Sequence, residues 1–150
     1  MTKYVTGFLF SLDGNDVALI EKQKPEWQKG MINGIGGKIK DGETPAQAME
    51  REFAEETGVV IPAEKWDHYV TLYNDWFECH FFRAKSDKIK DVRTMEKETV
   101  VTLNIRVALV GAPLIPNLHW LIPLAQDVGL HIGEGNVLVI KDGKPSNAPP

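Results

Sequence analysis

The chain has 150 residues, of which 43% are hydrophobic and 25% are charged, and its net charge is −4 at pH 7. This composition excludes a disordered chain, a collagen-like fibre and a disulfide-rich miniprotein. The negative net charge argues against non-specific binding to duplex nucleic acid, which depends on cations that neutralise phosphates.

The first third of the chain predicts a β-hairpin followed by a glycine-rich segment. Residues 4–10 and 17–21 are apolar and β-branched, and the turn residues DGND at 13–16 join them. A polar stretch then leads to the glycine-rich segment NGIGG at 33–37. We therefore expect two adjacent strands that precede a loop or bend rich in glycine.

Residues 45–57 carry the clearest helix signals in the sequence. Thr44 is a favourable N-cap, Pro45 suits the first helical position, and Gln47 completes a capping box. Gly58 supplies the residue at which a helix commonly ends. The pattern predicts a helix with both of its ends specified by local sequence.

The rest of the chain alternates strand and helix signals. We expect strands at 69–73 and 76–83, a solvated charged loop at 86–98, strand character at 98–109, a helix at 117–126 that Pro123 kinks or delays, and a strand at 137–141. We expect one domain over residues 1–141 and a flexible tail at 142–150. Strands interspersed with helices indicate a layered α/β or α+β fold.

Three carboxylates cluster on the helix predicted at 45–57. With 100° per residue, Glu52, Glu55 and Glu56 share an arc about 100° wide that borders the apolar positions Met49 and Phe53. An acidic helix face is commonly a solvated surface, but acids next to the apolar stripe lie near the body of the domain. Such a cluster favours a hard divalent cation, and Mg²⁺ prefers oxygen ligands together with substrate phosphates.

The same helix carries a long sequence motif. Gly37, five residues, Glu43, seven residues and then REFAEETGV at 51–59 match every fixed position of GX5EX7REUXEEXGU. The chain therefore resembles the Nudix family, whose defining box this is. The resemblance implies the Nudix fold, a mixed β-sheet sandwiched between helices. It also implies hydrolysis of a nucleoside diphosphate linked to another group, with Mg²⁺ or Mn²⁺ as cofactor.

The resemblance also implies a set of metal ligands. Glu52, Glu55 and Glu56 match the family's metal-binding glutamates, and the region of Gly37 matches a backbone carbonyl ligand. Glu98 lies where related enzymes have a glutamate outside the box that reaches the metals.

Other box residues are expected to act in catalysis or positioning. Arg51 resembles the residue that orients the catalytic glutamates, and Glu43 resembles the acid that anchors the loop. Glu52 is our first choice as the base that takes a proton from water, while Glu56 and Glu98 remain alternatives.

Four residues are candidates for substrate binding. Asn33 and Asn117 match positions that contact the base in the nucleoside triphosphatases of the MutT-like branch. Trp27 either lines the base pocket or is an exposed loop aromatic, and Lys38 either contacts phosphate or is a surface lysine.

By elimination among the family's branches, the leading expectation is a MutT-like nucleoside triphosphate pyrophosphohydrolase. It would convert an NTP or dNTP, with oxidised purine nucleotides among the candidates, to the monophosphate and pyrophosphate. The alternatives are hydrolysis of ADP-ribose or a dinucleoside polyphosphate, and a nucleotide-sensing module that does not hydrolyse. The expected partner is a small-molecule nucleotide, with no duplex nucleic acid, and the expected state is a monomer or homodimer.

The expected location is the cytoplasm. Cys79 is the single cysteine and lies in an apolar run, which fits a reducing compartment and a buried side chain. No window reaches about 18 apolar residues, so no membrane contact is expected.

Overall fold

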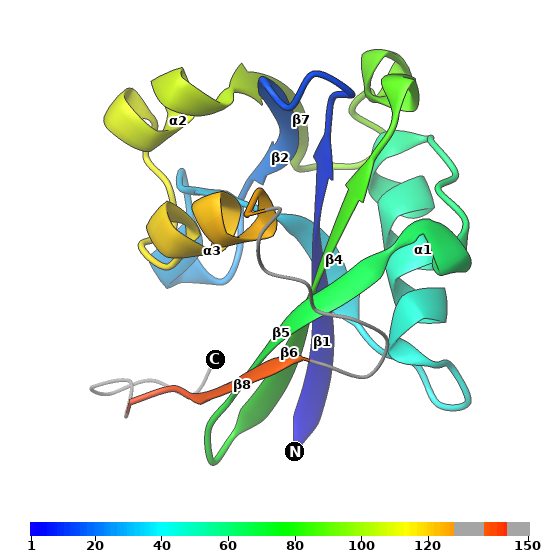
Figure 1. The fold of residues 1–150 in the computed structure, drawn as a ribbon. Helices are drawn as coiled ribbons and strands as arrows, with labels where there is room; N and C mark the ends of the chain where they lie inside the picture. Colours follow the sequence, from blue (N-terminus) through cyan, green and yellow to red (C-terminus); the bar gives the residue numbers. More distant parts are fainter. Residues whose placement is uncertain (128–136, 144–150) are drawn as a thin grey trace.

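The computed structural model describes residues 1–127 and 137–143 (Figure 1). Its strands are β1 (Thr2–Phe10), β2 (Asp16–Glu21), β3 (Ile32–Asn33), β4 (Ile35–Lys38), β5 (Asp67–Tyr73), β6 (Phe77–Lys85), β7 (Thr99–Asn104) and β8 (Leu138–Lys141). Its α-helices are α1 (Pro45–Thr57), α2 (Ile105–Gly111) and α3 (Leu118–Ala125). Short 3₁₀ helices are η1 (Glu26–Gln28), η2 (Ala63–Lys65) and η3 (Asp87–Asp91).

The described strands form one mixed sheet. The strand order is β3-β2-β1-β6-β5-β8, with β4 pairing β1 and β7 pairing β2. β1 runs parallel to β6, and β5 runs parallel to β8, whereas the other pairs are antiparallel. The long β1–β6 ladder therefore forms the centre of the sheet and joins the N-terminal hairpin to the β5–β6 hairpin.

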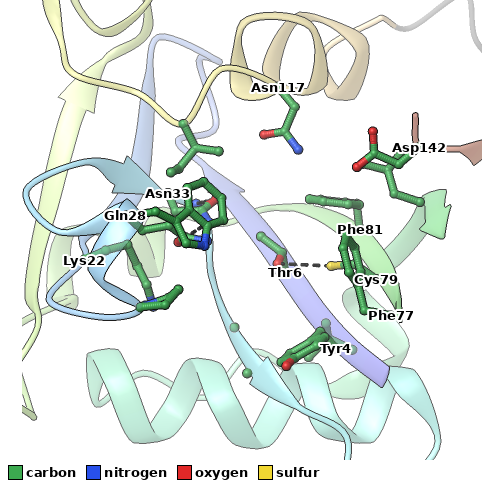
Figure 2. A pocket seen from close by; sticks show the side chains of 18 residues that line it. Tyr4, Thr6, Lys22, Gln28, Asn33, Phe77, Cys79, Phe81, Asn117 and Asp142 are labelled. Carbon is green, nitrogen blue, oxygen red and sulfur yellow. Dashed lines mark hydrogen bonds between the residues drawn. The ribbon is translucent and has the colours of Figure 1, made fainter. Parts of the chain in front are cut away.

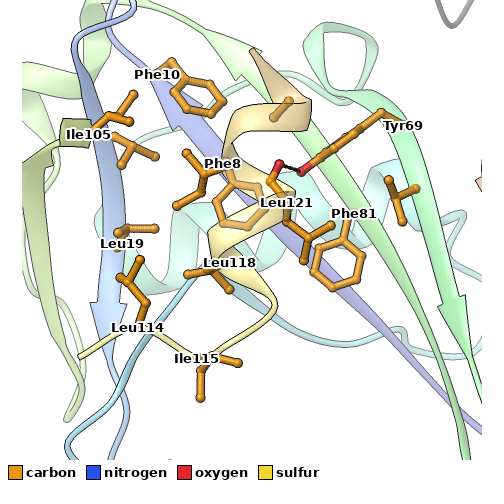
Figure 3. Close-up of a cluster of buried hydrophobic side chains, with 14 of the residues drawn as sticks. Phe8, Phe10, Leu19, Tyr69, Phe81, Ile105, Leu114, Ile115, Leu118 and Leu121 are labelled. Atoms are coloured by element: carbon orange, nitrogen blue, oxygen red, sulfur yellow. Dashed lines mark hydrogen bonds between the residues drawn. The ribbon is translucent and has the colours of Figure 1, made fainter. Parts of the chain in front are cut away.

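Helices cover both faces of this sheet (Figure 1). On one face α1 packs its side chains Met49 and Phe53 against β1 residues, and Phe53 also makes an edge contact with Trp66. On the other face α3 packs over β1 and β5, where the Tyr69 hydroxyl donates to the Leu121 carbonyl oxygen at 2.8 Å (Figure 3). The expected α+β architecture, a mixed sheet between helices, is confirmed.

Helix α1 begins and ends where its sequence predicts. Thr44 Oγ1 accepts from the Gln47 backbone N–H at 3.1 Å, and Gln47 Oε1 accepts from the Thr44 N–H at 2.9 Å, which together form a capping box. Gly58 adopts the left-handed conformation, with φ 75°, and its N–H donates to the Ala54 carbonyl. These two caps fix the position along the chain at which each glutamate of α1 lies.

The prediction of strand character over 98–109 is wrong in its second half. β7 ends at Asn104, and the next seven residues form α2. The Asn104 side chain accepts from the Val107 N–H at 3.3 Å and caps the helix, while Ile105 and Ala108 are buried. Helical spacing of the buried residues overrides the strand preference of the β-branched residues in this segment.

Two smaller expectations also differ from the structure. The charged loop at 86–98 contains the 3₁₀ helix η3, and α3 begins before Pro123, which lies inside it. Of the tail predicted at 142–150, residues 144–150 lie outside the described part of the chain. Cys79 is buried as expected. Within the described residues, none of the helices has the length and apolar character needed to cross a membrane.

Candidate active site

Arg51 on α1 is the centre of a polar network that holds the loop before the helix. Its Nε and Nη2 donate to the two carboxylate oxygens of Glu43 at 2.6 Å and 2.9 Å. Nη2 also donates to the Lys38 carbonyl oxygen at 3.0 Å, at the end of β4. Glu43 Oε1 accepts a further hydrogen bond from the Lys40 N–H at 2.8 Å. The bonds from Arg51 and burial together set the Glu43 pKa, and the Arg51 bonds prevail and lower it to about 2.

The same guanidinium reaches two of the acids on α1. Nη1 of Arg51 donates to Glu52 Oε1 at 2.7 Å and to Glu55 Oε2 at 3.3 Å. The Glu52 side chain is 13% exposed, whereas that of Glu55 is 44% exposed. Arg51 therefore bonds Glu52 closely and Glu55 at a longer distance, and its role in positioning the glutamates stays a prediction.

Glu52 lies directly against the backbone of β4. A Cβ atom built at Gly37 would be 2.5 Å from Glu52 Cδ and 2.5 Å from its Oε1. Real Cβ contacts are essentially never that short. Glycine at position 37 thus leaves the space that the Glu52 carboxylate occupies, and it brings that carboxylate next to the β4 backbone.

Glu56 is the acid of α1 that has a free oxygen in a buried position. Its Oε2 is buried and has no hydrogen-bond partner among the described residues. Burial and, to a smaller extent, the nearby charges of Glu96, Glu98 and Glu52 together raise the Glu56 pKa to about 7. A carboxylate in this position gains from a cation that would neutralise it.

Glu98 lies just before β7 and is held by the end of β2. Its oxygens accept from Lys22 Nζ at 2.9 Å and from the Gln23 N–H at 2.6 Å. Burial acts to raise the Glu98 pKa, but the bonds from Gln23 and Lys22 outweigh it and hold the pKa below its usual value. The carboxylate faces the α1 acids closely enough for its charge to raise the Glu56 pKa.

These oxygen donors fit a divalent cation in their chemistry. A bound cation would use two features of the site. They are the unpartnered Glu56 Oε2 and the Glu52 carboxylate that lies against Gly37. In the described residues, no three acidic, histidine or cysteine side chains already surround one point. Glu52 and Glu55 are instead bonded to Arg51, and Glu98 is bonded to Lys22, so binding a cation requires these three carboxylates to exchange partners.

A cavity of about 580 Å³ lies beside β4, and Figure 2 shows the side chains that line it. The residues Gly36 and Gly37 of β4 line it, and Gly37 is the residue on which Glu52 rests. Lys22 also lines the cavity while its ammonium group pairs with Glu98. The cavity and the acids of α1 therefore meet along β4 and at the end of β2.

Three of the four predicted substrate-binding residues line this cavity, namely Asn33, Asn117 and Trp27. Asn33 Nδ2 donates to Gln28 Oε1 at 3.3 Å, and its Oδ1 accepts from the Gly34 N–H at 2.8 Å. Asn117 points into the cavity from the start of α3 (Figure 2). Its Oδ1 is buried and has no partner among the described residues.

Trp27 and Lys38 are both exposed. The Trp27 side chain lies at the cavity mouth and is 54% exposed. Lys38 is not one of the lining residues, and its backbone oxygen, not its side chain, is used by Arg51.

Several lining residues come from the central strands and were not predicted. They are Tyr4 and Thr6 of β1, Phe77, Cys79 and Phe81 of β6, and Asp142 after β8. In β6 the lining residues are two apart, because alternate residues of a strand share one face, whereas in β1 Val5 also lines the cavity between Tyr4 and Thr6. This period-two pattern was visible in the sequence, but only the parallel pairing of β1 with β6 shows that the two sets lie together.

Comparisons with known proteins place the chain among characterised folds. The NUDIX domain model matches residues 2–113. None of the curated proteins matches the chain in sequence. Among the solved structures that resemble it, the three described next have low identity, so each likeness concerns the fold.

The first of these is a MutT from a study of Aliivibrio salmonicida and Vibrio cholerae, at 20% identity and a TM-score of 0.69, covering 83% of this chain and 95% of that one. The NUDIX domain of Shewanella oneidensis NrtR, solved with ADP-ribose, has 21% identity and a TM-score of 0.69, covering 82% and 84%. MutT from Methanosarcina mazei has 16% identity and a TM-score of 0.65, covering 83% and 91%.

Proposed function

The chain belongs to the NUDIX domain family, and from that premise we propose that it is a metal-dependent hydrolase of nucleoside polyphosphates. In this proposal an NTP or dNTP is cleaved to the nucleoside monophosphate and pyrophosphate. The family generally uses divalent metal ions, and we propose Mg²⁺ or Mn²⁺ here because every candidate ligand is an oxygen.

The observation that carries the proposal is the contact between Glu52 and Gly37. Gly37 lines the cavity on one side and leaves room for the Glu52 carboxylate on the other. A nucleotide whose base fills the cavity can therefore extend its phosphates toward α1, where the acids cluster. A base-sized apolar cavity without acids, or acids on an open surface, would not support this reaction.

The proposed metal ligands are Glu52, Glu55 and Glu56 on α1, with Glu98 and the backbone of Gly37. When bound, a divalent cation neutralises phosphate oxygens and lowers the pKa of coordinated water. The unpartnered Glu56 Oε2 and the raised Glu56 pKa support a cation at this position. The exposed Glu55 is available to join from the rim of the site.

Arg51 and Glu43 act as positioning residues in this proposal. Arg51 bonds Glu43 with two nitrogens and Glu52 with a third, so the loop acid holds the guanidinium and the guanidinium holds Glu52. Glu52 is the proposed base that takes the proton of the attacking water. Glu56 and Glu98 are the alternatives for that role.

The proposed base subsite is the apolar part of the cavity. Asn33 and Asn117 supply amide groups that can both donate to and accept from a base edge, and Trp27 lies at the mouth. Phe77 and Phe81 offer aromatic surface on which a base can pack. Lys38, on the exposed end of β4, is a candidate for contact with a distal phosphate.

A substrate panel tests the proposal directly. The full chain is assayed with the eight common NTPs and dNTPs, oxidised dGTP, ADP-ribose and dinucleoside polyphosphates, with Mg²⁺, with Mn²⁺ and with excess chelator. We expect a nucleoside triphosphate to be the best substrate, with pyrophosphate as product and no turnover in chelator. Glu52→Gln is the inactive reference, and Glu64→Gln, an exposed acid of η2, is the matched control. Phosphate release in place of pyrophosphate, or turnover in chelator, would contradict the proposal.

The second candidate is hydrolysis of ADP-ribose or a dinucleoside polyphosphate. It rests on the ADP-ribose bound to the NUDIX domain of Shewanella oneidensis NrtR, which shares the fold of this chain. A module that senses nucleotides without hydrolysis is a further candidate, and it is opposed by the presence of every acid of the box. The same panel separates these outcomes.

For an enzyme of this kind with one buried cysteine, we propose the cytoplasm as the compartment.

A further inference from the structure

Two histidines face each other on the side of the sheet that is opposite to the cavity. His68 of β5 and His80 of β6 are 12 residues apart in sequence, but His68 Nε2 lies 3.3 Å from His80 Nδ1. The neighbours of His80, Cys79 and Phe81, point to the other face and line the cavity. The histidine pair therefore lies outside the cavity, on the face of the sheet that α1 covers, where His80 pairs with Val5 and Val5 pairs with Gly37.

A β-bulge brings the pair together. The β5–β6 ladder pairs His68 with Phe82 and Thr71 with His80, and its register shifts between His68 and Val70. In a regular strand, residues 68 and 71 would point to opposite faces, but the extra residue of the bulge puts both on one face. Thr71 Oγ1 lies 2.9 Å from His68 Nε2 and 3.4 Å from His80 Nδ1, which confirms that the three side chains converge.

A carboxylate holds the outer side of the pair. Glu78 Oε2 lies 3.0 Å from His80 Nε2, so that nitrogen carries a proton and His80 Nδ1 accepts from His68 Nε2. His68 Nε2 also lies 3.2 Å from the Val70 carbonyl oxygen, so a metal ion would have to displace the proton of this nitrogen. The His68 ring stacks on Phe82, with 5.0 Å between ring centroids, and this contact limits its rotation. A histidine that donates to a carboxylate through one nitrogen and offers the other is the usual arrangement of a metal ligand.

The spacing of the two nitrogens suits one metal ion. With metal–nitrogen bonds of about 2.0–2.1 Å, two nitrogens 3.3 Å apart subtend an angle of about 107° at the metal, close to the tetrahedral value.

We propose that His68 and His80 form a second metal site for a transition ion that prefers nitrogen ligands, such as Zn²⁺. Glu78 positions His80 and does not itself bind the ion. The described residues offer no third histidine, cysteine or acid around this point, so water completes the coordination. The ligand chemistry separates this site from the oxygen-rich acids of α1, because imidazole favours zinc, copper and nickel, whereas carboxylates and carbonyls suit Mg²⁺ and Mn²⁺.

Nitrogen NMR of the histidine rings tests the site in the wild-type chain. Zn²⁺ is titrated in the presence of excess Mg²⁺, which competes for the acids of α1. We expect the ring nitrogens of His68 and His80 to shift together and to saturate at one equivalent, while the ring of the exposed His119 on α3 does not change. Unchanged resonances of His68 and His80 at saturating Zn²⁺ would overturn the proposal, and this result needs no variant.

Affinity measurements by calorimetry then assign the roles. His80→Ala and His68→Ala should each remove the one-equivalent binding event, and Glu78→Gln should weaken it by about 10–100-fold, the usual cost of losing the carboxylate behind a ligand. His119→Ala is the matched control and should bind as the wild type does. Equal Zn²⁺ affinity of wild type and a folded His80→Ala variant would contradict the assignment. Neither experiment depends on nucleotide hydrolysis, so its outcome is independent of the proposed function.

Discussion

Glu52 occupies the space that a side chain at Gly37 would need. A Cβ at that position would lie 2.5 Å from Glu52 Oε1, so the carboxylate can rest on β4 only because residue 37 is glycine. The contact joins the acids of α1 to the wall of the cavity. A single methyl group added at residue 37 would therefore separate the acids of α1 from the cavity.

Gly37→Ala should reduce turnover strongly because the new methyl group displaces the Glu52 carboxylate. A displacement of about 1 Å in a catalytic group can cost about 10²-fold in rate, and we expect a loss of that size in kcat. Gly111→Ala is the matched control, because a Cβ at Gly111 meets no atom within 4 Å. Wild-type kcat in a folded Gly37→Ala variant would show that Glu52 does not need its position on β4.

The second prediction concerns Glu43 and the pH dependence of stability. Glu43→Gln should lower Tm at pH 7 by about 2–4 °C, because it weakens charged hydrogen bonds to Arg51 worth about 1 kcal/mol. The Glu43 pKa is lowered in the folded chain to about 2 from an ordinary value of 4.5. The stabilisation is therefore complete above about pH 4.5 and is lost as the pH falls toward 2.

Thermal unfolding at pH 7 and at pH 3 measures this effect. The Tm difference between wild type and Glu43→Gln should be largest at pH 7 and should shrink at pH 3. Glu64→Gln, at an exposed acid of η2, should show no such difference. A Tm gap that grows on acidification would contradict the ion pair with Arg51.

How far the sequence predicts this molecule depends on how local the determining contacts are. The bounds of α1 follow from Thr44, Gln47 and Gly58, whose effects act within one helical turn, and the structure has the same bounds. The strand expected through residue 109 failed at Asn104, because the cap and the burial of Ile105 become visible only when the segment packs.

In the candidate site too, contacts that are local in sequence were predictable and long-range contacts were not. The acids of α1 share a face because helical geometry follows from the sequence, so their proximity was predictable. The aromatic side chains that line the cavity could not be predicted to lie together. Tyr4 and Phe77 are 73 residues apart and meet only through the parallel pairing of β1 and β6. Likewise, a bulge in β5, which nothing in the sequence signals, puts His68 beside His80.

Glu56→Gln should separate activity from stability. The substitution keeps the size of the side chain but removes a charge that is partly buried and lies near Glu96 and Glu98. We expect turnover to fall by about 10²-fold, since the proposed ligand loses its charge. In metal-free buffer at pH 8 the free energy of unfolding should rise by at least a few tenths of a kcal/mol, because like-charge repulsion is relieved.

Thermal shift with and without Mg²⁺ completes this test. Added Mg²⁺ should raise the Tm of the wild type more than that of Glu56→Gln, because a ligand stabilises only the state that binds it. Near-normal turnover together with an unchanged response to Mg²⁺ would return Glu56 to the role of an ordinary surface acid.

The last prediction concerns base recognition by Asn117. Its Oδ1 is buried without a partner among the described residues, so truncating the side chain removes no protein hydrogen bond at that oxygen. Asn117→Ala should therefore change the free energy of unfolding by less than about 0.5 kcal/mol. If the amide contacts the base, kcat/KM for purine triphosphates should fall by an amount equivalent to about 1–3 kcal/mol, with a much smaller change for pyrimidines. Asn33→Ala is the informative comparison, because Asn33 also bonds Gln28 and the Gly34 N–H and should lose stability as well as activity. An equal loss of kcat/KM for every nucleotide in Asn117→Ala would contradict the base subsite and leave the assignment of the acids on α1 intact.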